Sequence, residues 1–329
     1  MDKNIKKEKY LEQGIEVIKG SRDDLEGYVY KFKESGLYVR ELEYDTGKGG
    51  EPVEICQITD THISLLNEKD KEENNPSVMS TYERRGWLRN GTAIPMFETA
   101  MEYASLFDCT VISGDIIDYL TWGSLEYIRE NILKTDKDVI FTLGGHDITR
   151  VMTGLVPDDT TLESRKEIVS RFIPHDIDYH SEVLGDKVIV VAINNGETRY
   201  YEKQLEALKK DIEKAKKENL IILIFQHEPI ATRNPDEKVV LPICDNDDSP
   251  KGFNFCDNKK YIGSHSIDDV TDEVYNMMTG NADVIKGIFC GHEHYDYKTE
   301  IINRDNITPQ YVLGINAYRN GRVMKIKVK

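Results

Sequence analysis

Histidine and aspartate side chains recur where the apolar segments of this sequence end. Five such segments are followed at once by these residues, and five of the eight histidines lie at the junctions. Imidazole and carboxylate ligands together favour divalent ions of the manganese, iron and zinc class. The pattern therefore predicts a transition-metal site. The five junctions are Asp60-Thr61-His62, Gly114-Asp115 with Asp118, Gly144-Gly145-His146-Asp147, His227-Glu228-Pro229 and Gly291-His292-Glu293-His294.

A site for two ions would give these residues a definite chemistry. A carboxylate such as Asp115 can bridge two ions about 3.5–4 Å apart, the spacing used for in-line displacement at phosphorus. Such ions polarise a phosphoryl oxygen and activate water, so the protein need add only a proton donor for the leaving group. A single GD or DxH at a strand end more often serves as a cap or a turn. Five such junctions in order favour the metal site.

Apolar strands must bring these junctions together. The alternation of such strands with amphipathic helical stretches predicts an α/β fold with much parallel sheet, whose ligands lie at the carboxyl ends of the strands. After residue 297 the strands follow one another without helices, and Asn320-Gly321 predicts a tight hairpin between the last two strands. The segments predicted to be buried strands are 53–59, 109–113, 138–143, 187–193, 220–226 and 283–290.

The ordered motifs DxH, GDxxD, GGHD, a lone histidine and GHEH resemble those of the calcineurin-like metallophosphoesterase superfamily. The resemblance implies a four-layer α/β/β/α sandwich over residues 51–329, with two mixed sheets flanked by helices. Residues 1–50 are expected to form an N-terminal extension with a β-hairpin around Ser35-Gly36. The implied activity is that of a phosphatase or phosphodiesterase. It would hydrolyse a small phosphomonoester or phosphodiester by attack of a metal-activated water at a dinuclear site.

The resemblance also implies a role for each matching residue. His146 would act as general acid or orient the phosphate, and Asp118 would be its carboxylate partner, since a nearby carboxylate keeps an imidazole charged and oriented. Two divalent ions, manganese, iron or zinc, are the expected cofactors. The implied metal ligands are Asp60, His62 and His294 for the first ion, His227 and His292 for the second, and Asp115 as the bridge.

One position departs from the pattern of the family. Where the family has an asparagine that binds the second ion and helps to hold the phosphate, this chain has Gly145, which has no side chain. Water, Asp147 or Asn194 could replace that ligand, or the second ion could bind weakly and arrive with the substrate. A non-catalytic binding scaffold is the alternative. The completeness of the other ligands favours the enzyme.

Two long polar connections, residues 64–93 and 228–268, are expected to be insertions in this domain. Connections of this length in a compact domain are usually functional or disordered. The first contains Arg84, Arg85 and Arg89, which could bind phosphate from a cap over the ions. The alternative is that these arginines pair with carboxylates of this acidic protein.

The composition narrows the choice of partners. A formal net charge of −16 argues against long nucleic acid, whereas a small phosphoester remains compatible because bound metal reverses the local potential. The sequence has no apolar run near the roughly 20 residues of a membrane helix and no signal-peptide core. The five cysteines are scattered without CxxC pairing, as is typical of a reduced protein. A cytoplasmic location away from membranes is expected.

Overall fold

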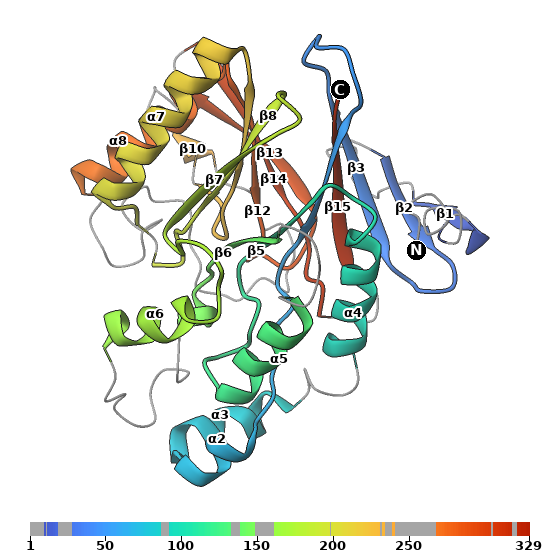
Figure 1. The fold of residues 1–329 in the computed structure, drawn as a ribbon, viewed down its shortest axis with the longest axis vertical. Helices are drawn as coiled ribbons and strands as arrows, with labels where there is room; N and C mark the ends of the chain where they lie inside the picture. Colours follow the sequence, from blue (N-terminus) through green and yellow to red (C-terminus); the bar gives the residue numbers. More distant parts are fainter. Residues whose placement is uncertain are drawn as a thin grey trace.

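Two mixed β-sheets lie face to face at the centre of the molecule in a computed structural model (Figure 1). Helices cover the outer face of each sheet, so the fold has the four layers that the sequence analysis predicted. The residues described are 10, 12–18, 28–86, 92–132, 139–148, 161–197, 199–230, 232–233, 239–240, 268–303, 305–317 and 321–329.

The first sheet has seven strands and contains both chain-terminal regions. Its β4, β5 and β6 are mutually parallel, whereas β15 pairs antiparallel with β4 and parallel with β3. In spatial order its strands are β1 (Ile15–Val17), β2 (Tyr28–Phe32), β3 (Tyr38–Tyr44), β15 (Arg322–Val328), β4 (Val53–Ile58), β5 (Cys109–Ser113) and β6 (Val139–Thr142).

The second sheet has six strands, and its β8, β9, β12 and β14 are mutually parallel. The antiparallel strands β13 and β7 form its two edges. In spatial order its strands are β13 (Tyr297–Asn303), β14 (Asn306–Val312), β12 (Ile285–Cys290), β9 (Ile221–Phe225), β8 (Val188–Ile193) and β7 (Tyr179–Leu184). A separate two-stranded ribbon pairs β10 (Thr232–Arg233) with β11 (Val239–Val240).

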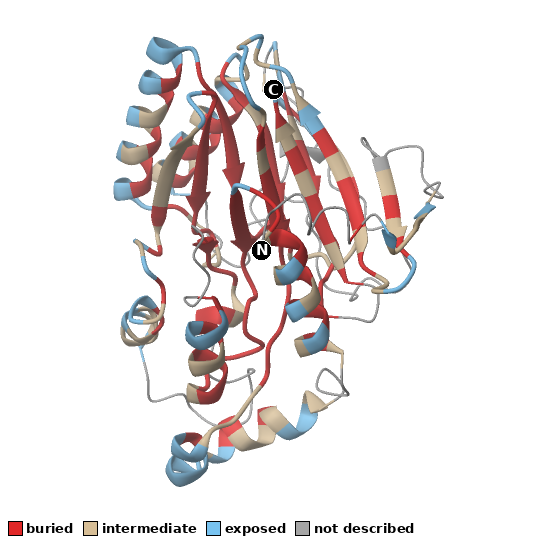
Figure 2. Cartoon of the chain, turned by 45° about the vertical axis from the view of Figure 1, so that its right-hand side comes forward, coloured by how far each residue is buried: buried red, intermediate tan, exposed pale blue. Residues whose placement is uncertain are grey.

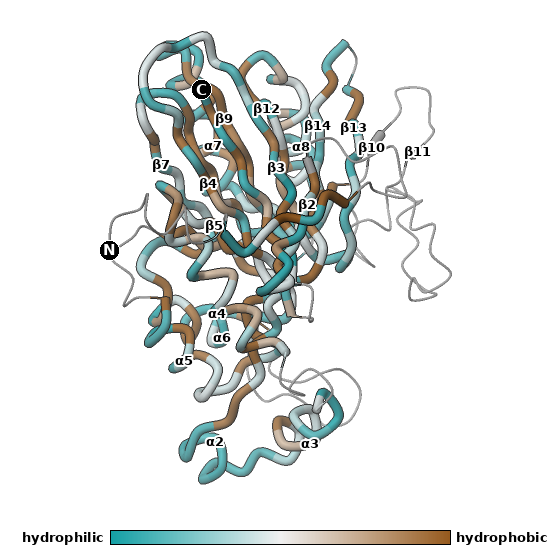
Figure 3. Tube along the Cα trace, turned by 90° about the vertical axis from the view of Figure 1, so that its right-hand side faces the viewer, coloured by the Kyte–Doolittle hydropathy of each residue, from teal (hydrophilic) through white to brown (hydrophobic). Residues whose placement is uncertain are grey.

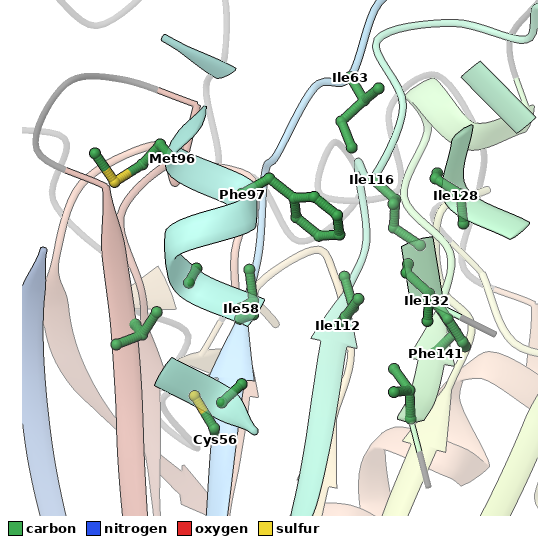
Figure 4. Packing of buried hydrophobic residues seen from close by; sticks show 14 of the residues in the cluster. Cys56, Ile58, Ile63, Met96, Phe97, Ile112, Ile116, Ile128, Ile132 and Phe141 are labelled. Carbon is green, nitrogen blue, oxygen red and sulfur yellow. The ribbon is translucent and has the colours of Figure 1, made fainter. Parts of the chain in front are cut away.

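The helices pack on the outer faces of the sheets. Leu208 of α7 and Met278 of α8 are fully buried against the second sheet, and Phe97 of α4 lies near Ile58 and Ile112 of the first (Figure 4). The helices described are α2 (Glu68–Glu73), α3 (Pro76–Arg84), α4 (Ala93–Ala104), α5 (Trp122–Ile132), α6 (Leu162–Ser170), α7 (Glu202–Glu218), α8 (Asp269–Gly280) and the 3-10 turn η2 (His146–Ile148). No described helix is long and apolar enough to span a membrane.

Alternate residues of the central strands serve two cores. In β8, Val190 faces the other sheet while Val191 packs on the helices, as the two-residue period of a strand requires. The rings of Phe225 and Phe289, with centroids 4.9 Å apart, stack in the layer between the sheets. Burial on both faces makes these strands continuously apolar, as Figures 2 and 3 show. The result is a rigid frame at whose edge the junctions lie.

The predicted hairpin between the last two strands is wrong. β14 belongs to the second sheet and β15 to the first, so the chain crosses between sheets over residues 313–321. Asn320 itself lies outside the described residues. The crossing places β15 between two other strands, where Met324 and Ile326 are fully buried between the sheets. A local hairpin at an edge would leave these side chains less buried.

Two further segments refine the expectations. β2 and β3 pair antiparallel around Ser35-Gly36, and β3 then joins β15 within the seven-stranded sheet. Within the connection 64–93, the structure has α2 and α3 where the sequence analysis noted only a polar segment. Asn75 caps α3, which has proline at its first position.

Candidate metal centre

All five junctions meet at one edge between the two sheets. β4, β5 and β6 of the first sheet and β9 and β12 of the second end there, because the strands within each set are parallel. The sheets are also tied directly at this edge, since His227 Nδ1 lies 2.9 Å from the carbonyl oxygen of Ser113. The predicted ligands therefore reach one site from both sheets.

The first cluster consists of Asp60, His62 and His294, whose ligand atoms lie within 4.8 Å of one another. His62 Nε2 is 3.1 Å from His294 Nε2 and 3.7 Å from Asp60 Oδ1. Asp60 and His62 are buried, whereas the side chain of His294 is 38% exposed and lies at the mouth. The other oxygen of Asp60, Oδ2, accepts hydrogen bonds from the Thr59 hydroxyl and from the His292 backbone N–H.

The second cluster consists of Asp115, His227 and His292, again within 4.8 Å. Asp115 Oδ2 is 3.1 Å from His227 Nε2 and 3.9 Å from His62 Nε2, so one carboxylate oxygen lies between the two clusters. His227 directs Nε2 inward because its Nδ1 is held by the carbonyl of Ser113. This placement fits a bridging carboxylate.

The backbone at these ligands is unusual. Among the described residues, eight non-glycine residues have positive φ, and five of them belong to the clusters. Such residues are uncommon and gather at functional sites, where the surrounding structure holds them. The five are Asp60 (53°), His62 (43°), Asp115 (48°), His292 (72°) and His294 (65°). The turns after β4, β5 and β12 are therefore shaped to direct these side chains.

The arrangement of polar atoms fits divalent cations. Asp60 Oδ1 and His227 Nε2 are buried and make no hydrogen bond, although a neighbouring ligand atom lies 3.2 Å and 3.1 Å away, respectively. Buried polar atoms are almost always hydrogen-bonded, so these two require another partner. Imidazole nitrogens and carboxylate oxygens that converge without hydrogen-bond geometry are suited to transition metals.

The electrostatics of the clusters agree with a cation site. Burial opposes charge on His62, but the carboxylates of Asp118 and Asp60 outweigh it and raise the pKa to about 10. Burial likewise opposes charge on His227, and Asp115 outweighs it, which raises that pKa to about 10. At His292 burial dominates, with His227 adding to it, and the pKa falls to about 4. The carboxylates therefore demand positive charge, which divalent ions would supply.

His146 lies beside the clusters, with 30% of its side chain exposed. Its Nδ1 is 2.5 Å from the carbonyl oxygen of Asp118 and 3.6 Å from the carboxylate oxygen Oδ1. Because a carbonyl can only accept, Nδ1 carries a proton, and any proton that the ring exchanges moves at Nε2. The His146 backbone N–H also donates to Asp115 Oδ1 at 3.0 Å. Asp118 thus lies beside His146, and its main contact with the imidazole is made by the Asp118 backbone carbonyl rather than by the carboxylate.

The carboxylate of Asp118 has two other partners. Oδ1 lies 3.3 Å from His62 Nδ1, and Arg85 grips both carboxylate oxygens, with Nε at 3.1 and 2.9 Å. Burial raises the pKa of Asp118, but His62 and Arg85 outweigh it and lower the pKa below its usual value. A carboxylate on the second nitrogen of a ligand histidine fixes its tautomer and orientation. No motif in the sequence signals this link from Arg85 through Asp118 to His62.

The two glycines of the GGHD junction have different surroundings. A Cβ on Gly144 would lie 2.1 Å from Asp115 Oδ1, so a side chain there would displace the bridging candidate. A Cβ on Gly145 would meet only the carbonyl oxygen of Gly196, at an ordinary 3.6 Å. Gly144 is therefore required by close packing. The absence of a side chain at Gly145 is not imposed by space.

The two residues suggested as replacement ligands are engaged elsewhere. Asp147 accepts backbone N–H groups of Ile116, Ile117 and Gly144, and so ties the GDIID and GGHD turns together. Burial and the charge of Asp115 raise the pKa of Asp147 to about 7. Asn194 accepts from the Gly196 N–H and donates to Asp178. Both side chains serve the scaffold of the turns.

The predicted substrate arginines have different positions. Arg85 is the partner of Asp118, as the alternative interpretation of an ion pair within the protein had it. Arg84 is exposed at the end of α3. Arg89 lies outside the described residues, as do residues 241–267 of the second insertion.

Comparison with known proteins gave matches by structure alone. No family model and no curated protein sequence matches the chain. A dimetal phosphatase from Danio rerio is 11% identical over 80% of this chain and 88% of its own, with a TM-score of 0.45. A calcineurin-like phosphoesterase, YfkN from Bacillus subtilis, is 14% identical over 81% and 82%, with a TM-score of 0.36. A putative 5'-nucleotidase from Staphylococcus aureus is 13% identical over 81% of this chain and 49% of its own, with a TM-score of 0.39.

The chemistry of the site accordingly follows from the residues of this chain. Its motifs occur in the expected order, each after a strand. Their carboxylates and imidazoles meet in the two clusters and in a third group, His62, Asp118 and His146, which shares His62 with the first cluster. The expected fold of two mixed sheets flanked by helices and the expected clustering of Asp and His side chains are both confirmed.

Proposed function

We propose that this chain is a metal-dependent phosphoesterase. The first cluster, Asp60, His62 and His294, would hold one divalent ion, and His227 and His292 would hold a second. The observation that carries the proposal is the position of Asp115 Oδ2, 3.1 Å from a histidine of one cluster and 3.9 Å from a histidine of the other. Manganese, iron or zinc suits this donor set.

Two ions at this site would polarise the phosphoryl group and supply a nucleophile from water at neutral pH. The residues of the chain provide the rest of the reaction. Water adds to phosphorus and releases one proton to solvent, the bond to the ester oxygen breaks, and His146 gives its Nε2 proton to that oxygen and later regains one from solvent. The products are phosphate, or a phosphomonoester from a diester, and an alcohol. The Asp118 carbonyl keeps the Nδ1 proton of His146 in place during this transfer.

The substrate is proposed to be a small phosphomonoester or phosphodiester. The net charge of −16 opposes approach of a long polyanion, whereas a small ester needs only the local positive charge of the ions. Arg84, exposed at the end of α3 in the first insertion, remains a candidate for contact with such an ester.

The direct test measures hydrolysis of 4-nitrophenyl phosphate and bis(4-nitrophenyl) phosphate by the full chain, with and without added Mn²⁺. Wild-type protein should hydrolyse at least one ester only when metal is present. His146→Ala should lower kcat by about 10²–10⁴-fold, the usual contribution of a positioned acid. His180→Ala is the matched control, because His180 belongs to neither cluster.

Two results would contradict the proposal. Activity that survives in His146→Ala would remove His146 from the reaction. Absence of hydrolysis with both esters, in protein shown to bind two ions, would favour a binding scaffold instead.

A further inference from the structure

A cavity of about 630 Å³ opens beside Gly145, one residue from the proposed acid. Gly145 and Gly196 form one side, and Ile148 and Leu162 provide apolar walls. The volume is in the range of pockets that bind small organic ligands. The cavity is thus placed to receive the organic part of a phosphoester whose phosphate lies at the clusters.

Two arginines and a tyrosine give this cavity a recognisable chemistry. Arg165 of α6, Arg199 and Tyr201 line it, and all three are at least partly exposed. Among the described residues, no carboxylate forms an ion pair with Arg199. Guanidinium groups bind carboxylate and phosphate with two parallel hydrogen bonds. The cavity can therefore offer positive charge to an anion.

The acidic residues that line the cavity leave the positive charge of Arg199 available to a ligand. Glu197 is held by two groups of its own, since it accepts from Lys166 Nζ at 2.9 Å, which also pairs with Asp178, and from the Tyr201 hydroxyl. Glu163 is exposed on the first turn of α6. Among the described residues, an anion entering the cavity would not compete with any carboxylate for Arg199.

Gly145 connects this cavity with the reacting centre. Its Cβ position is open, with Gly196 O at 3.6 Å as the nearest atom, and Gly145 itself lines the cavity. A larger side chain here would begin at the edge of the cavity. The departure from the family motif therefore leaves space for substrate beside His146.

We infer that this cavity selects small phosphomonoesters whose organic part carries a second anionic group, which Arg165 and Arg199 bind. The inference rests on the proposed function, since the cavity adjoins the proposed phosphate site. It assigns specificity for the organic part of the ester to residues outside the two clusters.

The test uses two probes of nearly equal shape, 4-carboxyphenyl phosphate and 4-carbamoylphenyl phosphate. The carboxylate probe should show a kcat/KM about tenfold higher, as expected from one charged hydrogen-bonded pair of about 1.4 kcal/mol. Arg199→Gln and Arg165→Gln should bring this ratio towards one. Arg171→Gln should preserve the ratio, because Arg171 lies on the same segment but pairs with Glu167 at the surface.

A binding measurement separates this inference from the proposed function. Titration calorimetry with 4-carboxybenzylphosphonate and 4-carbamoylbenzylphosphonate should show tighter binding of the carboxylate, dependent on Arg199, even if turnover is absent. Equal kcat/KM for the two esters, or a ratio unchanged in both arginine variants, would overturn the inference and leave the phosphoesterase intact. If neither ester is hydrolysed, the proposed function fails, and equal affinity of the two phosphonates would then overturn the inference as well.

Discussion

The two clusters of the metal centre differ in how they are supported. In the first, His62 Nδ1 lies 3.3 Å from the buried carboxylate of Asp118, which Arg85 grips in turn. In the second, His227 is set by a backbone carbonyl, and the neighbouring Gly145 offers no side chain beside an open cavity. We therefore expect the first cluster to hold its ion more tightly. We expect the second cluster to lie next to the space that the substrate would occupy.

The largest effect is expected where the clusters meet. Asp115→Asn keeps the shape of the side chain but removes the charge between the two histidine sets. Both ions should bind more weakly, and kcat/KM should fall by more than about 10²-fold, since even loss of an outer partner costs 10–100-fold. Metal analysis after dialysis, together with the aryl phosphate assay, measures this change. Retention of two ions with normal affinity would show that Asp115 is not a bridge.

Arg85→Gln tests the support of the first cluster. Loss of the charged grip on Asp118 should weaken the first ion by about 10–100-fold while leaving the second less affected. Competition with a metal-sensitive dye would resolve the two affinities. Arg84→Gln is the comparison, because a role in substrate contact would raise KM without a change in metal affinity. Equal weakening of both ions in Arg85→Gln would contradict the separation of the clusters.

Gly145→Asn tests the open side of the second cluster. The added amide oxygen should tighten the second ion by about tenfold, roughly 1.4 kcal/mol. Gly145→Ala adds only the Cβ, which has room, and serves as the control. Calorimetric titration with Mn²⁺ of protein already holding one ion would measure the difference. Identical affinity in the two variants would mean that the side chain at this position does not reach the ion.

The smallest predicted effect is a loss of folding stability at low pH, through protonation of His175. His175 Nε2 accepts the Phe141 N–H of β6 at 2.9 Å, and burial lowers the pKa of His175 to about 4. The folded pKa is below the unfolded value of 6.5, so the stabilisation is complete above pH 6.5 and is lost as pH falls towards 4. After allowance for partial exposure, the free energy of unfolding should fall by about 1 kcal/mol over that range.

Denaturant unfolding of metal-free protein at pH 7 and pH 4.5 measures this loss. In His175→Gln, the fall in the free energy of unfolding between the two pH values should be smaller by about 1 kcal/mol. If the loss of stability between pH 7 and pH 4.5 is the same in His175→Gln as in the wild type, neutral His175 does not stabilise β6, the strand that leads to Gly145 and His146.

The positions of the clustered residues could be predicted from sequence because they depend on a local rule. Each ligand directly follows an apolar strand, and parallel strands end at a common edge, so Asp60 and His292 were placed together without knowledge of the sheets. The arginine that supports Asp118 beside His62 could not be predicted from such a local rule. Arg85 reaches Asp118 from the end of α3, and no local pattern fixes where that helix packs.

The position of β15 shows the same distinction between local and long-range information. Asn320-Gly321 is a strong local turn signal, yet β15 pairs with β3 and β4, strands that lie near the other end of the sequence. Burial of Met324 and Ile326 between the sheets decides the pairing. The helix α3, by contrast, had a readable signal in Asn75-Pro76, a cap followed by proline.

The left-handed backbone at five clustered residues has a consequence for how this protein could change. Each such position costs the folded chain about 1 kcal/mol that glycine would not lose. Replacement of His292 by glycine should therefore relax the turn while it removes a ligand. Such a substitution would raise the stability of the folded chain at the expense of the proposed metal site. At these five turns the folded chain is less stable than glycine would make it, which is the stability cost expected of a functional site.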